Sequence, residues 1–315
     1  MTQNALPTIP RVDASGLDAW LDANEATADE RRVVGELRDD GLALVDLSDE
    51  ATLDRCDQAW AEVDAYFEAG AVRVQDAWLQ SPSMKSLACD ARVMRLLRLA
   101  YGREPFPFQT LNFRSGSQQF PHSDTTHFHS EPAKFMCGVW LALEDVHEGA
   151  GPLVYYPGSH KLPPLTPRVM GIKSRTPDKA DYATHNNQAV ENIISEHGFQ
   201  EQFGLIKKGQ ALIWAANLLH GGSPVSEAER TRKSLVTHYF FEDCLYHTPM
   251  TVGDDITAAS VRIPFDISAG HVRWPRRNGR PAMPTFRTIA ATARALLSKR
   301  PIVFDAHGQA RRIRK

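Results

Sequence analysis

The stretch FMCGVWLALEDVHEGAGPLVYYPGSH, from Phe135 to His160, decides the fold class of this chain. Residues 135–143 and 153–156 are short runs of aromatic and apolar side chains, separated by a glycine-containing turn. After the second run, Pro157 and Gly158 stand in the order that a type II turn prefers. Short apolar runs bounded by turn residues are typical of strands in a sandwich or a closed barrel.

Outward from this stretch, the same pattern recurs on both sides of it. Further short runs that predict strands lie at 108–114, 202–207, 211–215 and 234–241. Many short strands with turns between them predict a mainly β protein with helical additions (α+β).

The amino-terminal third predicts helices instead. Residues 26–40 and 50–69 carry apolar side chains at three- and four-residue spacing, and Gly41 and Gly70 follow them where a helix ends. Residues 42–47 between them predict a strand, and a third helix is expected from 83 to 102. A further helix is expected at 181–197, as an insertion between strands.

The sequence predicts one domain over residues 1–315, because it contains neither an internal repeat nor a low-complexity linker. Within it we distinguish a helical part (1–106), a β core (107–245) and a basic carboxyl-terminal extension (246–315). The composition, 42% hydrophobic and 23% charged residues, is typical of a protein with a packed core and excludes a disordered or fibrous chain.

Charge is unevenly distributed along the chain. The formal net charge is −2, but residues 271–315 contain twelve Lys or Arg against one acid, Asp305, so this segment is +11 and the remainder −13. A basic segment can attract an anionic substrate, a lipid surface or nucleic acid, or it can simply offset an acidic body. Four scattered cysteines and the absence of a signal-peptide pattern predict the cytoplasm, and no apolar run reaches eighteen residues.

The extension also contains an amphipathic segment at 285–299. Its apolar side chains fall on one side at helical spacing. They are Phe286, Ile289, Ala293, Leu296 and Leu297. We expect a helix that caps the barrel, although a helix lying on a membrane surface would have the same pattern.

The first candidate for a metal site is the segment Pro121-His122-Ser123-Asp124. Side chains two residues apart on extended backbone project to the same side, so His122 and Asp124 can converge on one ion. Joined by a second imidazole, they would form the two-histidine, one-carboxylate site that leaves iron positions open for a 2-oxo acid and dioxygen. Taken alone, His-x-Asp is a weak signal.

Four short sequence motifs, which follow one another in a characteristic order and spacing, support the interpretation of His122 and Asp124 as metal ligands. Together they resemble the phytanoyl-CoA dioxygenase family, from about residue 107 to 239. The elements are His122-Ser-Asp124, Trp140-Leu-Ala-Leu-Glu-Asp145, Gly151-Pro-Leu153 and Pro157-Gly-Ser-His160. The resemblance implies a double-stranded β-helix, that is, a jelly-roll or cupin-like barrel, flanked by amino- and carboxyl-terminal helices.

The resemblance also implies the remaining site residues. His220, at the end of an apolar strand, is the implied third metal ligand, and an arginine about eleven residues later would anchor 2-oxoglutarate. Arg232 lies twelve residues on and is preferred to Arg230, because it shares a face with Ser234, whose hydroxyl can add a donor. Trp140 stands at a position that lines the 2-oxoglutarate pocket in the family, although an aromatic in a central strand can equally be core.

The implied activity is that of an Fe(II)- and 2-oxoglutarate-dependent dioxygenase that uses O2 to hydroxylate an unactivated C–H bond of a small molecule, with release of succinate and CO2. An anionic or carrier-linked substrate is favoured by the basic extension. Two alternatives stay open: a jelly-roll that binds a metal or saccharide without catalysis, and an oxygenase that grips nucleic acid with the basic extension. The second is disfavoured, because the extension has few aromatic residues for base stacking. The sequence leaves the oligomeric state open.

The sequence says less about the roles of three other histidines. His127 and His129 alternate on extended backbone and could bind a metal themselves, but contact with the substrate or with the metal ligands is the preferred interpretation. His160 belongs to the turn motif, and we expect it to stabilise that loop.

Overall fold

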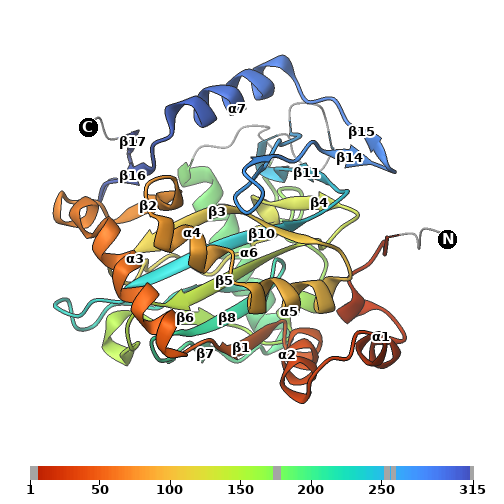
Figure 1. The fold of residues 1–315 in the computed structure, drawn as a ribbon, viewed down its shortest axis with the longest axis horizontal. Coiled ribbons are helices and arrows are strands. Elements are labelled where there is room, and N and C mark those ends of the chain that lie inside the picture. The colour runs from red at the N-terminus through yellow and green to blue at the C-terminus, as the bar shows by residue number, and fades with distance from the viewer. Residues whose placement is uncertain (1–5, 173–178, 252–255, 257–259, 313–315) are drawn as a thin grey trace.

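A large antiparallel sheet forms the centre of the molecule in the computed structural model, which describes residues 6–172, 179–251, 256 and 260–312 (Figure 1). It has eight strands in the order β1-β8-β5-β10-β3-β2-β16-β17. In that order, their bounds are Leu42–Asp46, Gln210–Ala215, Met136–Ala142, Ser234–Phe241, Pro105–Phe113, Arg73–Gln75, Ile302–Phe304 and Ala310–Arg312.

Two neighbouring inner strands, β5 and β10, are buried along their whole length. Alternate side chains of β5 face opposite layers: Val139 and Leu141 pack in the core with the amino-terminal helices, whereas Trp140 packs in a second cluster on the other face. Both faces of these strands are therefore covered, which explains why they read as continuous apolar runs in the sequence.

Helices cover one face of the sheet. Figure 1 shows α3, α4 and α5 in front of it, and their apolar side chains, such as Trp60 and Leu97, belong to the same core as those of β5. The helices have the following bounds: α1 Leu17–Ala23, α2 Ala28–Asp39, α3 Glu50–Glu68, α4 Pro82–Ala88, α5 Ala91–Tyr101, α6 Lys179–His197 and α7 Phe286–Ser298.

The opposite face of the sheet is partly closed by a smaller layer. It is a three-stranded sheet in the order β7-β6-β9, and a separate strand pair joins β11 to β4. Their bounds are β4 His129–Glu131, β6 Leu153–Tyr155, β7 Gln202–Phe203, β9 His220–Gly222 and β11 Leu245–His247. Two facing antiparallel layers with flanking helices agree with the predicted jelly-roll class, although the strands among the described residues do not close into one continuous barrel.

Two element predictions were wrong in detail. The single helix predicted at 83–102 is two helices, α4 and α5, because Asp90 caps the start of the second by accepting a hydrogen bond from the backbone N–H of Arg92. The strand predicted at 202–207 ends at Phe203, and the backbone then turns. The helix predicted at 181–197 is present as α6.

The carboxyl-terminal extension consists of short strand pairs, the helix α7 and a final hairpin. Besides β16 and β17, its strands are β12 Phe265–Asp266, β13 His271–Val272, β14 Arg276–Arg277 and β15 Arg280–Pro281. The helix α7 forms as predicted, but it does not cap the barrel with its apolar side: Phe286 is 84% and Leu297 83% exposed, and no residue of α7 is buried. The extension instead attaches through β16, which pairs with β2 and buries Val303. No helix of the described residues combines the length and apolarity needed to cross a membrane.

Candidate metal centre and its cavity

The two predicted histidine ligands are brought together by their own backbones. His122 and His220 form an isolated antiparallel bridge, in which each backbone N–H donates to the other's carbonyl, at 2.9 and 3.1 Å. Their imidazole rings consequently lie side by side, with centroids 4.7 Å apart. Because the bridge fixes both Cα positions, two residues almost a hundred positions apart in sequence share one site.

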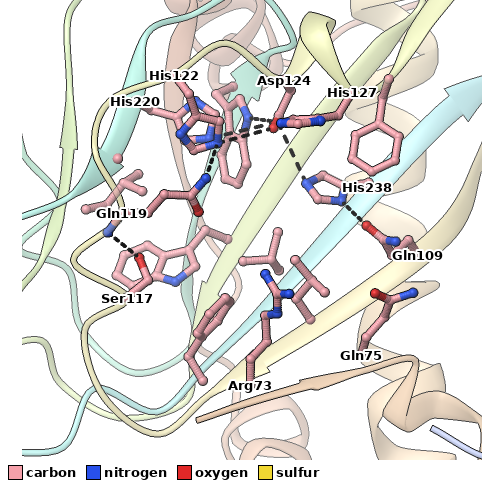
Figure 2. A pocket seen from close by; sticks show the side chains of 18 of the residues that line it. Arg73, Gln75, Gln109, Ser117, Gln119, His122, Asp124, His127, His220 and His238 are labelled. Carbon is pink, nitrogen blue, oxygen red and sulfur yellow. Dashed lines mark hydrogen bonds and ion pairs between the residues drawn. The ribbon is translucent and has the colours of Figure 1, made fainter. Parts of the chain in front are cut away.

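Asp124 completes the group from the start of a short 3-10 turn, Asp124–Thr126, rather than from extended backbone as predicted. Ser123 precedes the turn in extended conformation and accepts a hydrogen bond from the backbone N–H of Thr125. One ligand atom from each of His122, Asp124 and His220 lies within 4.8 Å of the other two, and Figure 2 shows the three side chains converging. The structure thus places the three predicted residues at one point.

The imidazoles present the nitrogen that a metal needs. In each ring Nδ1 lies 3.1 Å from the carbonyl oxygen two residues earlier, that of Phe120 or Leu218. A carbonyl can only accept, so Nδ1 carries the proton and Nε2 keeps its lone pair. The Nε2 atoms of His122 and His220 lie 3.7 and 3.9 Å from the Asp124 carboxylate.

The protonation states suit metal binding. Burial, together with the neighbouring His220, lowers the pKa of His122 to about 3. Burial alone would raise the pKa of Asp124, but the surrounding imidazoles and a hydrogen bond from Trp214 bring it to about 2. At neutral pH, His122 is therefore neutral and Asp124 ionised, which are the forms that coordinate a cation.

Trp214 holds the carboxylate in place. Its indole Nε1–H donates to Asp124 Oδ2 at 2.9 Å. The indole ring fits against the backbone of β5 because the facing residue is Gly138, where a side chain would overlap the ring. His238 lies on the other side, with Nε2 3.7 Å from Asp124 Oδ2 and Nδ1 3.0 Å from the amide oxygen of Gln109.

The three candidate metal ligands lie on the wall of a cavity of about 390 Å³. Arg232 and Trp140 line the same cavity, and the guanidinium carbon of Arg232 lies 5.2 Å from the Trp140 ring centroid. Arg232 is 3% exposed; its Nη1 donates to the Gly151 carbonyl at 2.7 Å, whereas its Nε is buried and has no partner among the described residues. The cavity thus contains a buried cation whose Nε–H has no partner among the described residues.

The other predicted residues are distributed as follows. Ser234 is fully buried on the face of β10 that carries Val236 and His238, and its hydroxyl has no partner among the described residues, but it does not line the cavity itself. Arg230 lies at the surface and forms an ion pair with Glu227. His127 lines the cavity, whereas His129 does not and packs against His247 instead.

His160 follows the predicted turn, in which Gly158 has a positive φ of 82°. Its Nε2 lies 3.2 Å from the carbonyl oxygen of Arg38, and Asn217 donates to its carbonyl. The predicted role as a loop-stabilising residue agrees with these contacts.

Sequence reasoning missed several cavity residues. His238 could have been found, since it continues the alternation of Arg232, Ser234 and Val236 on one face of a predicted strand. Trp214 stands in another predicted strand with no spacing signal that links it to Asp124. Gln119, whose amide nitrogen lies 3.3 Å from His122 Nε2, and Arg73 and Arg262 likewise carry no motif.

Comparison with known proteins connects this site to a family. Residues 25–233, about two thirds of the chain, match the family described as phytanoyl-CoA dioxygenase (PhyH). Similar curated proteins include the ectoine dioxygenases of Halomonas elongata (30% identical; 44% of this chain and 43% of that protein) and Sphingopyxis alaskensis (29% identical; 46% and 49%). The chain therefore spans about half the length of these relatives or less.

Solved structures show the same fold at low sequence identity. The non-haem α-ketoglutarate-dependent epimerase SnoN from nogalamycin biosynthesis has a TM-score of 0.55 at 20% identity, covering 81% of this chain and 96% of that one. EctD from S. alaskensis with 2-oxoglutarate and 5-hydroxyectoine has a TM-score of 0.53 at 18% identity, covering 76% and 85%. The family match confirms the resemblance carried by the four sequence elements: the chain belongs to the phytanoyl-CoA dioxygenase family.

Proposed function

We propose that this protein is an Fe(II)- and 2-oxoglutarate-dependent dioxygenase that hydroxylates an unactivated C–H bond of a small molecule and releases succinate and CO2. The observation that carries the proposal is the meeting of His122, Asp124 and His220 on the wall of a cavity that also contains Arg232. Family membership supports it, as do the relatives named ectoine dioxygenase.

The donor set fits iron(II). His122, Asp124 and His220 would hold the ion through two neutral imidazoles and one carboxylate, and this arrangement leaves coordination positions for other ligands. When bound, the iron with its co-substrate and O2 supplies the oxidising power that no side chain possesses. The chain itself keeps these ligands buried. Trp214 fixes the carboxylate, and the carbonyls of Phe120 and Leu218 orient the two rings.

The surroundings of Arg232 fit 2-oxoglutarate. Burial lowers the pKa of Arg232 to about 10, which still leaves the side chain protonated at neutral pH. A buried cation without an acidic partner is costly, so a dicarboxylate that reaches it would gain a charge-assisted hydrogen bond from the unpartnered Nε. Ser234 does not line the cavity, but its buried hydroxyl has no partner among the described residues and lies two residues along the chain from Arg232. Trp140 would pack beside the co-substrate. Arg230 is not part of this proposal, because it is paired at the surface.

An anaerobic titration tests the proposal. Fe(II) and then 2-oxoglutarate are added, and formation of the metal-to-ligand charge-transfer band is expected with the wild-type protein and not with Asp124→Ala. A metabolite screen for succinate release under O2 then identifies substrates. Absence of the band in the wild type, or an undiminished rate of 2-oxoglutarate consumption by Asp124→Ala, contradicts the proposal.

The same screen separates the alternatives. A jelly-roll that only binds ligands predicts no succinate with any compound. An oxygenase acting on nucleic acid predicts salt-sensitive binding that is lost when residues 271–315 are deleted. The cytoplasmic location and an anionic substrate remain parts of the proposal.

A further inference from the structure

Two arginines outside the proposed metal and co-substrate sites line the same cavity. We propose that Arg73 and Arg262 together recognise an anionic group, a carboxylate or a phosphate, on the molecule that is oxidised. This inference rests on the proposed function, because it assigns the substrate class of that site. Both residues border the cavity that contains His122, Asp124 and Arg232.

Arg73 enters the cavity from the sheet. It is the first residue of β2, which pairs with β3 beside the cavity residues Leu111 and Phe113. Figure 2 shows its guanidinium reaching into the space across from the histidines. Its Nε is buried, and its side chain forms neither a hydrogen bond nor an ion pair with any residue that the structure describes. Its guanidinium carbon lies 3.8 Å from the centroid of the Phe304 ring of β16.

Arg262 enters from the carboxyl-terminal extension. Its Nη1 donates to the hydroxyl of Thr248 at 2.8 Å, and its guanidinium lies over the Phe128 ring at 4.9 Å. Burial lowers its pKa to about 10, and the charge of Asp76 opposes this shift. The Phe128 ring in turn packs 5.1 Å from His238, which neighbours Asp124. Arg262 is therefore two side chains away from the proposed metal ligand.

Charge balance points to an anion. Asp124 is the one carboxylate among the described residues that line the cavity, against the three arginines Arg73, Arg232 and Arg262. A divalent ion and the doubly charged co-substrate would be balanced by Asp124 and Arg232. Arg73 and Arg262 then remain as two positive charges on the cavity wall. Asp76 acts on Arg262 through its charge, but neither arginine forms an ion pair within the described part of the chain, so an anionic ligand would supply that partner.

The type of side chain narrows the ligand class. A guanidinium offers parallel N–H donors that match a carboxylate or a phosphate, and the Phe304 and Phe128 rings hold the two guanidinium groups in place. Arg262, Thr248 and Phe304 all lie beyond residue 233, where the match to the family ends. The carboxyl-terminal extension thus completes the end of the cavity that would distinguish this chain's substrate.

The experiment compares charged and neutral probes on the protein loaded with Fe(II) and saturating 2-oxoglutarate, without O2. The probes are two matched pairs: hexanoate with hexanamide, and hexyl phosphate with hexanol. Isothermal titration is expected to show that the charged member of at least one pair binds about tenfold more tightly or better. Tighter binding of hexanoate than of hexanamide would indicate a carboxylate on the substrate. Tighter binding of hexyl phosphate than of hexanol would indicate a phosphate.

Variants connect this preference to the two arginines. Arg73→Gln and Arg262→Gln are each expected to lose most of it, Arg73→Lys to keep part of it, and the surface control Arg230→Gln to keep all of it. Equal binding of charged and neutral probes by the wild type overturns the inference, and so does a preference that survives in both glutamine variants. If the charge-transfer band forms normally in these variants, the proposed function is retained whatever the probes show. If the band does not form in the wild type, the proposed function itself is contradicted.

Discussion

Two pairs of packed histidines lie in this protein, and they differ in what surrounds them. His122 and His220 have ring centroids 4.7 Å apart, and His129 and His247 have theirs 5.1 Å apart. Both pairs sit at cross-strand positions, the first across an isolated bridge and the second in register between β4 and β11. Proximity of two imidazoles is therefore common to both and does not by itself make a metal centre.

The two histidine pairs differ in whether a carboxylate lies beside both imidazole rings. Asp124 lies within 4 Å of both rings of the first pair, whereas Glu131, on the same strand as His129, is held by an ion pair with Arg277. Among the described residues no third ligand atom joins His129 and His247. Burial lowers their pKa values to about 4 and about 3, so they are neutral packing groups at physiological pH. A metal site needs a free acidic ligand as well as paired imidazoles.

Removing each pair's nearby carboxylate gives the largest expected contrast. Asp124→Ala is expected to weaken Fe(II) binding at least about 100-fold, because the loss of an outer partner alone costs about 10- to 100-fold. Glu131→Ala is the matched control, and its Fe(II) affinity should equal that of the wild type. Anaerobic Fe(II) titration measures both, and equal affinities for the two variants would remove the distinction between the pairs.

The next largest effect is expected at Arg232, the proposed anchor of 2-oxoglutarate. Arg232→Gln is expected to raise the 2-oxoglutarate concentration needed for half-maximal charge-transfer absorbance about 10- to 100-fold, because a charge-assisted hydrogen bond in a buried site is lost. Fe(II) affinity should change little. Arg230→Gln serves as the control, and an effect of Arg230→Gln as large as that of Arg232→Gln would show that the anchor is misassigned.

Removing the hydrogen bond from Trp214 tests whether this bond positions the Asp124 carboxylate for Fe(II). Trp214→Phe keeps most of the ring but removes the Nε1–H that donates to Asp124, so Fe(II) affinity is expected to fall about tenfold. Trp140→Phe changes another indole of the same cavity that makes no such bond, and it should leave Fe(II) affinity unchanged. If both variants bind Fe(II) like the wild type, Trp214 has only a packing role.

The second histidine pair should affect stability rather than activity, and at neutral pH its effect is the smallest. The folded-state pKa of His247 lies below its ordinary value of 6.5, so below pH 6.5 the unfolded chain takes up a proton that the folded chain does not. The free energy of unfolding therefore falls as the pH drops from about 6.5 towards 4, by about 1.4 kcal/mol per pH unit for this group.

His247→Gln is expected to reduce this pH dependence, and the exposed His271→Gln is the control that should not. Urea unfolding at pH 7, 6, 5 and 4 measures the difference. An unchanged slope in His247→Gln would mean that His247 is protonated in the folded protein, and activity at neutral pH should be unaffected in either variant.

The sequence by itself determined the fold class, and it predicted the candidate site residues that its motifs contain. Residues 135–160 indicate strands because apolar runs and turn residues alternate there, and His122, Asp124, His220 and Arg232 followed from local spacing and from the family resemblance. These properties are local: they depend on periodicity and on residue type, which can be read without coordinates.

Only the tertiary structure decided which side chains surround those residues. His238, Trp214, Arg73 and Arg262 come from separate segments, and the pairing of strands and the packing of the extension bring them to one cavity. The same is true of α7, whose apolar pattern predicted burial although its apolar side is largely exposed. A periodic pattern fixes the face of an element that is apolar, but the partner of that face is set by long-range contacts between segments, which local sequence does not encode.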